Sequence, residues 1–483
     1  MPTISLPDDP SLAHLRGQAR SLQRAANAGD PVARQRILAH RQGHDGDVPL
    51  SLAQLALARE YGFASWPRLR HHLDVIARYR RDPEPDGDDP FCRLACLNYT
   101  QDGPDRWAQA RALRPEVPES IWAAAVASDP AAVKGFLAAD VTLARAEGGP
   151  YRLTALAYLA YSRLDPEVHE DQVLDTARIL LRAGADPNAG YLWRGLTTPF
   201  TVLTGVLGEG EQGPRHQPRH PHWYALARLL LQAGADPNDG QGLYNRMFVP
   251  GTEHLELLLE FGLGRGSGGP WRARLGDALE TPERMLRQQL SWALRNHHAD
   301  RVRLLAEHGV DVRAPFADGR TPAEVAALAG DPEAVAILVD RGVESPRLSP
   351  AEALIAAILG EDQETASRLL DADPSLAERI RSAHPGLVLE AADAGRVRAV
   401  TVLAELGFDV SARARPGSGH ANGATPLHVA AIDGHEATVA ELLRLGADPT
   451  VHDAEHGSTP LGWAEYAGQA GTADLLREPP SRS

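Results

Sequence analysis

Apolar residues recur along much of this chain in short runs with helical spacing, most clearly near the C-terminus. Residues 425–450 read TPLHVAAIDGHEATVAELLRLGADPT. Thr followed by Pro favours a helix start, because Thr can cap the first turn and Pro needs no hydrogen bond there. Gly434 breaks this helix, and Gly446 ends a second helix as a left-handed cap. The apolar positions of the two predicted helices are Leu427, Ala430, Ala431, Val439, Leu442 and Leu443.

The same unit recurs towards the N-terminus. In residues 425–446 and again in 321–342, a cap glycine follows the starting Thr by 21 positions. The units at 154–184 and 198–234 are longer, with the additional residues between their two helices, where an insertion leaves the stacking undisturbed. One helix pair cannot bury its apolar face alone, so stacked copies are required. The pattern predicts about ten units between residues 118 and 478.

These features resemble the ankyrin repeat. TPLH, the paired alanines, the GH turn and the ending LL-x-x-GAD-P appear in order within residues 425–449. The resemblance implies an all-α solenoid that binds a protein partner through its concave face, formed by the first helices and the turns that follow them. It therefore implies a non-enzymatic scaffold or regulator. Carried over unit by unit, it directs these residues towards the partner: Tyr161, Arg295, Asn296, Asp393, Ile432, Asp433 and Tyr466.

The chain divides into six segments by composition and periodicity. They are a small basic helical domain at 1–82, a linker and helical N-terminal cap at 83–117, a first repeat block at 118–266, a Gly-rich link and short helix at 267–285, a second repeat block at 286–478 and a disordered tail at 479–483.

Charge separates the head from the rest of the chain. The 483 residues include 49 Lys or Arg and 64 Asp or Glu, a formal net charge of -15. Residues 1–81 contain twelve Arg and seven acidic residues, so the head is basic and the remainder acidic. An acidic body repels nucleic acid and anionic membranes. No apolar run approaches the ~18 residues of a membrane span. We expect a cytoplasmic monomer, in which Cys92 and Cys96 are small buried hydrophobes.

A DNA-binding regulator remains an alternative function. Residues 51–81 predict a helix, a short turn containing Gly62 and a second helix, as in a helix-turn-helix. Here the basic head would bind DNA, and the repeats would act as a sensor. Nucleic acid would be bound only through residues 1–82. The side chains predicted to face the groove are Arg68, Arg70, His71 and His72.

A metal-binding protein or enzyme is the second alternative. His216, His220 and His222 lie within seven residues in the sequence PRHQPRHPHW, and His is a common ligand of transition metals. No acidic residue or Cys adjoins them, so the same histidines also fit a Pro-rich insertion with no metal. The chain contains no phosphate-binding loop before a Lys and no G-x-S-x-G sequence. The sequence therefore predicts no cofactor and no catalytic residue.

Overall fold

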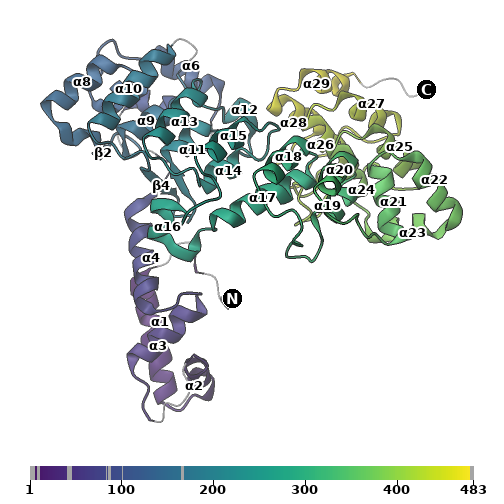
Figure 1. The fold of residues 1–483 in the computed structure, drawn as a ribbon, viewed down its shortest axis with the longest axis horizontal. Coiled ribbons are helices and arrows are strands. Elements are labelled where there is room, and N and C mark those ends of the chain that lie inside the picture. The colour runs from purple at the N-terminus through teal and green to yellow at the C-terminus, as the bar shows by residue number, and fades with distance from the viewer. Residues whose placement is uncertain are drawn as a thin grey trace. The chain divides into compact units, whose positions relative to one another are not determined.

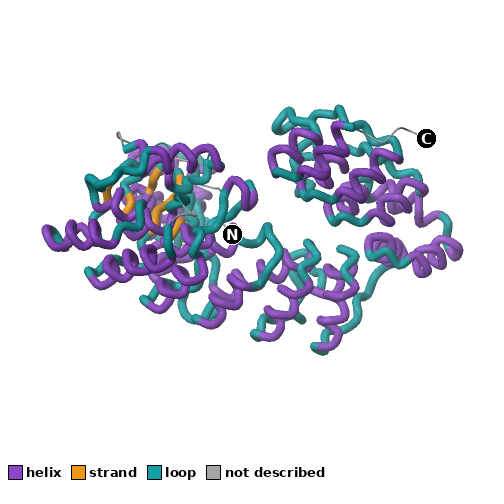
Figure 2. Tube along the Cα trace, turned by 90° about the horizontal axis from the view of Figure 1, so that it is seen from above, coloured by secondary structure: helices purple, strands orange, loops and turns teal. Residues whose placement is uncertain are grey.

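The computed structural model describes residues 6–7, 11–40, 46–82, 84, 89–100, 102–164 and 168–478, so the predicted tail at 479–483 lies outside the described residues. The chain forms two compact units. The first comprises Met1–Gly208, Arg219–Asn245 and Arg265–Pro282, and the second comprises Glu209–Pro218, Arg246–Gly264 and Glu283–Ser483. Helices dominate both units, and the strands of the described residues all lie in the first (Figure 2).

The first unit contains the head, the N-terminal cap and the first repeats. Its helices are α1 (Leu12–Asn27), α2 (Pro31–Leu38), α3 (Leu50–Glu60), α4 (Trp66–Tyr79), α5 (Pro90–Ala95), α6 (Pro104–Ala112), α7 (Ile121–Val126), α8 (Pro130–Ala139), α9 (Ala155–Tyr161), α10 (Glu170–Arg182), α11 (Val202–Leu207), α13 (Trp223–Gln232), α14 (Gly240–Asn245) and α16 (Gly269–Leu275). Its strands are β1 (Arg80–Arg81), β2 (Glu147–Gly148), β3 (Leu153–Thr154), β4 (Gly190–Trp193) and β5 (Pro199–Thr201). Short 3-10 turns lie at Val141–Ala144 and Gly276–Ala278.

The second unit contains the later repeats. Its helices are α12 (Gly213–His216), α15 (Glu253–Glu260), α17 (Pro282–Arg295), α18 (Ala299–Glu307), α19 (Pro322–Leu328), α20 (Pro332–Asp340), α21 (Pro350–Leu359), α22 (Gln363–Ala372), α23 (Ser375–Ala383), α24 (Leu387–Asp393), α25 (Val397–Glu405), α26 (Pro426–Ile432), α27 (Glu436–Arg444), α28 (Pro460–Ala467) and α29 (Ala470–Arg477). Within the described part of the chain, no helix is both long and apolar enough to cross a bilayer.

Local capping explains where the repeat helices begin. Thr321 precedes α19 and accepts a hydrogen bond from the Glu324 amide at 3.3 Å, while the Glu324 carboxylate accepts one from the Thr321 amide at 2.8 Å. This capping box satisfies two amides that have no partner inside the helix. Ser349 and Glu352 repeat the arrangement at α21. Thr followed by Pro therefore marks the start of α19, as the sequence predicts, and Ser followed by Pro acts in the same way at α21.

A continuous apolar core runs through the C-terminal repeats. It extends from α21 to α29 and includes Val439 and Leu442, both 0 % exposed. The first helices α24, α26 and α28 pack side by side, and α27 packs between α25 and α29 (Figure 1). This stacking of helix pairs confirms the all-α solenoid.

The head is joined to the first repeats by a small sheet that the sequence did not predict. α4 runs directly into β1, which pairs in parallel with β4, and β4 pairs antiparallel with β5. Val75 of α4, Leu192 of β4 and Trp271 of α16 lie in one apolar cluster. Residues 267–285, predicted as a Gly-rich link and a short helix, contain the helix α16, which contributes core side chains to the first unit.

In the repeat that ends at Gly262, an irregular segment, 246–251, follows the short first helix α14 and precedes α15. Arg301 of α18 is 1 % exposed and fills this region. Its guanidinium donates hydrogen bonds of 2.9 to 3.4 Å to the carbonyls of Arg246, Met247, Val249 and Gly251. One buried side chain thus satisfies carbonyls that a helix would satisfy internally, and its burial lowers the pKa of Arg301 to about 10.

Candidate functional site

The ends of successive first helices form a row of turns along the C-terminal repeats. Asp393 ends α24, Ile432 ends α26 and Tyr466 lies near the end of α28, each two residues before a turn glycine. Because these three helices pack side by side, the three residues lie on neighbouring repeats. The structure thus places these three predicted contact residues, with Asp433 beside Ile432, in one row, which we call the turn row.

A hydrogen bond between neighbouring repeats fixes each turn. The His435 imidazole donates through Nε2 to the carbonyl oxygen of Asp393 at 2.9 Å, and the Gln469 amide donates to the carbonyl of Ile432 at 3.2 Å. His435 and Gln469 each follow the turn glycine of their own repeat. These two bonds use only main-chain oxygens, so they do not involve the side chains of Asp393 and Ile432. Sequence reasoning missed this contact, although the GH pair in the repeat was its signal.

Carboxyl groups gather at these turns. Loss of hydration, together with the charge of Asp393, raises the pKa of Asp433 to about 7 and also raises the pKa of Glu390. Asp433 and Glu390 are nevertheless exposed, so the protein surrounds their carboxyls without covering them. The Asp393 carboxylate lies 3.9 Å from Nδ1 of His420. Such a surface favours an incoming positive charge, which would stabilise the ionised carboxylates.

A cavity of about 580 Å³ adjoins these carboxyls. Glu390 and His420 line it, together with Arg381, Arg413 and Arg415. Most of these residues lie outside the repeat pattern or in the loop between α25 and α26, where no periodic signal marks them. This volume is typical of a small-ligand pocket, and it is also large enough for a side chain that protrudes from another protein.

Tyr466 is 45 % exposed but is also contacted by the insertion at residues 209–218. The His216 ring of α12 stacks on the Tyr466 ring with 4.1 Å between centroids and 10° between planes. His216 also donates through Nε2 to the carbonyl oxygen of Tyr466 at 2.8 Å. A partner at this end of the turn row would therefore meet a surface to which His216 contributes.

Arg295 and Asn296 lie at the turn that follows α17. Arg295 is exposed and pairs with Asp318 at 3.3 Å. Asn296 is half-buried and donates to the carbonyl of Trp292 at 2.9 Å. Arg295 is thus accessible to a partner, whereas the Asn296 amide is partly used within its own helix.

Tyr161 does not lie at the surface, which contradicts its prediction as a contact residue. It is 1 % exposed, and its hydroxyl donates to the carbonyl of Thr201 at 2.9 Å. A Cβ atom added at Gly205 would lie 2.4 Å from its ring, so the next repeat packs directly on it. The physical reason is that α9 is buried along its whole length, from Ala155 to Tyr161.

The three histidines of the predicted metal site each have other surroundings. His216 bonds to Tyr466, His222 hydrogen-bonds to the carbonyl of Val168 at 2.7 Å, and His220 is buried at 3 % exposure. Burial lowers the pKa of His220 well below its usual value. The described residues contain no group of three His, Cys, Asp or Glu side chains placed to hold a metal ion. These histidines therefore do not fit the proposed site.

The predicted DNA-reading residues of α4 are only partly accessible. Arg68 and Arg70 are exposed. His72 is 5 % exposed, and burial lowers its pKa. A ring nitrogen of His71 hydrogen-bonds to the carbonyl of Arg274 at 3.2 Å, within the same unit. His71 is nevertheless exposed, so the DNA-binding alternative depends on Arg68, Arg70 and His71.

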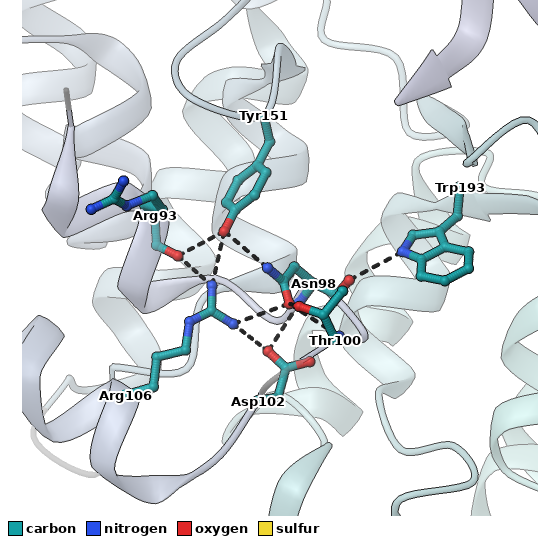
Figure 3. Close-up of polar contacts among 7 residues, drawn as sticks. All are labelled: Arg93, Asn98, Thr100, Asp102, Arg106, Tyr151 and Trp193. Carbon is teal, nitrogen blue, oxygen red and sulfur yellow. Dashed lines mark hydrogen bonds and ion pairs between the residues drawn. The ribbon is translucent and has the colours of Figure 1, made fainter. Parts of the chain in front are cut away.

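A buried polar network anchors the N-terminal cap in the first unit (Figure 3). Arg106 forms an ion pair with Asp102, whose side chain is 0 % exposed, and also donates to the Tyr151 hydroxyl at 2.8 Å. Asn98 donates to the same hydroxyl at 3.2 Å, and its carbonyl accepts from the Trp193 indole at 3.2 Å. Because these groups bind one another, we infer that the network stabilises the fold. The cap also contains Cys92 and Cys96, both free and buried, as predicted.

Comparison with known proteins places the turn row within a described family. Residues 388–481 match the family described as ankyrin repeats, in three copies. Over 82 residues the chain is 39 % identical to the inactive serine/threonine-protein kinase TEX14 of Mus musculus. That match covers 17 % of this chain and 5 % of the mouse protein, so the chain spans only a small part of that relative. The repeats at residues 388–481 are therefore ankyrin repeats.

Proposed function

We propose that this protein is a non-enzymatic scaffold or regulator that binds a protein partner along the turn row. The ankyrin match supports this proposal, because ankyrin repeats are generally protein–protein interaction modules. The observation that carries the proposal is the turn row itself. Its side chains reach the surface, and hydrogen bonds between repeats hold its main chain in place. A surface ordered in advance loses little conformational entropy on binding. A monomer in the cytoplasm is part of the proposal.

The charge of the turn row indicates the chemistry of the partner. Neither Glu390 nor Asp433 forms an ion pair within the described structure. We therefore expect the partner to present Lys or Arg to these carboxylates. Contacts of this kind raise the association rate and weaken as salt increases.

The test is quantitative affinity capture from a cell lysate with the full chain as bait. A D393K/D433K variant reverses two charges in the turn row. The matched control, D340K/D371K, reverses two exposed charges on the second helices α20 and α22. We expect one protein to be retained by the wild type and the control and to fall at least fivefold with D393K/D433K. Equal retention by D393K/D433K, or capture of nucleic acid instead, would overturn the proposal.

Tyr466→Ala tests the end of the turn row. Because Tyr466 is 45 % exposed, we expect the substitution to leave folding nearly intact and to weaken capture of the same partner. Thermal unfolding measured beside the capture separates the two effects. Unchanged capture would exclude Tyr466 from the contact surface.

A further inference from the structure

An arginine-rich cavity of about 540 Å³ lies in the first unit, where α4 and β1 meet the first repeats and α16. Its charged lining residues are Arg78, Arg81, Arg145, Glu147, Arg152, Asp186 and Arg274. Five arginines face two carboxylates, which leaves a formal surplus of three positive charges. The apolar part of the lining includes Tyr79, Leu153, Ala157, Pro187 and Trp271.

Two of the arginines, Arg78 and Arg81, are held in place by the Glu147 carboxylate. Arg78 binds this carboxylate with both terminal nitrogens, at 2.9 and 3.2 Å. Arg81 binds it at 2.8 Å, has a side chain only 6 % exposed and also donates to the carbonyl of Arg152 at 3.1 Å. Glu147 is therefore already shared by two guanidinium groups and cannot neutralise a third.

The other three arginines keep open hydrogen-bond donors among the described residues. Arg145 uses only Nε, which donates to the carbonyl of Gly184. The Arg274 guanidinium lies over the rings of Tyr79 and Trp271, 5.4 and 4.9 Å from their centroids, without an anionic partner. The Arg152 side chain forms no hydrogen bond or ion pair within the described structure. The Asp186 carboxylate accepts a bond from the amide of Asn188, so it serves its own turn.

Arg152 also adopts a left-handed backbone conformation, which is unfavourable for arginine. Its φ is 51°, in the turn between β2 and β3, where glycine would be relaxed. The charge of Arg152 acts on a second arginine of the cavity, Arg81. Burial lowers the pKa of Arg81, and the positive charges of Arg152 and Arg78 lower it further. A strained turn thus presents a guanidinium with no internal partner in a region of positive potential.

We propose that this cavity binds a small anion with two linked phosphate groups, of about the size of a nucleoside diphosphate. Guanidinium groups bind phosphate oxygens in bidentate fashion, and Arg145, Arg152 and Arg274 approach from three different segments of the chain. A diphosphate carries roughly three negative charges at neutral pH, which matches the surplus, whereas a dicarboxylate carries two. The cavity volume is typical of small-ligand sites.

Calorimetric titration of the full chain tests the ligand class. The probes are ADP and inorganic pyrophosphate, with succinate as the dicarboxylate, all at low salt. We expect one diphosphate to bind per chain, with an affinity at least tenfold higher than that of succinate and reduced by added salt. Absence of diphosphate binding, or equal affinity for succinate, would overturn the proposal.

Variants locate the site. Arg152→Ala and Arg274→Ala each remove one open guanidinium, and we expect each to weaken diphosphate binding about tenfold or more. Arg20→Ala is the matched control, because it removes an exposed charge on α1 outside the cavity. Thermal unfolding confirms that each variant is folded, and Arg274→Ala serves alone if Arg152→Ala does not fold. Equal weakening by Arg20→Ala would show non-specific attraction and contradict the site. All three variants leave the turn row unchanged, so partner capture is tested separately.

Discussion

The two units stabilise helical repeats by different means. In the C-terminal repeats the polar contacts are copies of one pattern, such as the cap formed by Thr425 and His428. In the first unit α11 has a capping box of the same kind, formed by Thr201 and Thr204, but an additional buried carboxylate that does not belong to the repeat pattern binds both hydroxyls. Asp239 there accepts bonds from the hydroxyls of Thr201 at 2.5 Å and Thr204 at 2.9 Å. Repeated contacts leave a periodic signal in the sequence, whereas single contacts leave none.

Leu442→Ala gives the largest expected change in this comparison. Leu442 is 0 % exposed in α27, between α25 and α29, so the substitution leaves a cavity in a core shared by three repeats. We expect a loss of roughly 2–5 kcal/mol in the free energy of unfolding. Hydrogen exchange of α25, α27 and α29 measures it. An unchanged exchange rate would mean that the repeat register at α27 is wrong.

Asp239→Ala is the corresponding test in the first unit. Asp239 is 4 % exposed, and its removal leaves the hydroxyls of Thr201 and Thr204 without their acceptor. We expect a loss of about 2–3 kcal/mol, measured by hydrogen exchange of α11 and α14. Asp171→Ala, at an exposed site on α10, serves as the control, with an expected change within about 0.5 kcal/mol. Equal effects of the two variants would show that buried single contacts do not stabilise the first unit.

His428→Ala tests one copy of the repeated cap, with an expected loss of about 1 kcal/mol at pH 8. Nδ1 of His428 accepts from the Thr425 amide at 3.1 Å, and Nε2 donates to the carbonyl of Ser458 at 3.0 Å, which requires the neutral imidazole.

This cap also predicts a pH dependence. Burial lowers the pKa of His428 from its usual 6.5, so the unfolded state takes up the proton first as the pH falls. The wild type therefore loses stability below about pH 6.5, and its advantage over His428→Ala shrinks towards pH 5. Glu324→Ala, which removes the capping box at α19, provides a control without an imidazole. A constant difference from pH 8 to pH 5 would contradict this account.

Asp433→Asn gives the smallest expected change, with the opposite pH dependence. The pKa of Asp433 is raised from the usual 3.8 to about 7, so the wild type loses stability as the pH rises through this interval. Asparagine is uncharged, so it removes the free-energy cost of ionising this carboxyl in the folded state. Because Asp433 is exposed, we expect a gain below about 1 kcal/mol at pH 8 that disappears near pH 4. Thermal unfolding at both pH values measures it, and destabilisation at pH 8 would refute the repulsion between carboxyls.

The sequence predicted the solenoid because its signals are local. Thr-Pro starts, cap glycines and the spacing of apolar residues act within one repeat. The family resemblance, carried over to each repeat, then placed Asp393, Ile432 and Tyr466 at successive turns. The pairing of β1 with β4 joins residues more than a hundred positions apart through strands of two and four residues, which have no periodicity to detect. Tyr161 has the same local pattern as the other turn residues, but its burial is decided by the next repeat.

The hydrogen bonds between the turns have a direction. The carbonyls of Asp393 and Ile432 are each held by the repeat that follows, so each repeat stabilises the turn of the repeat before it. The final carbonyl, that of Tyr466, is held instead by the His216 imidazole from the insertion at residues 209–218. Stepwise unravelling from the C-terminal repeat would thus have to break this contact first. Under mechanical load, the segment inserted at residues 209–218 would therefore oppose the unfolding of the last repeat.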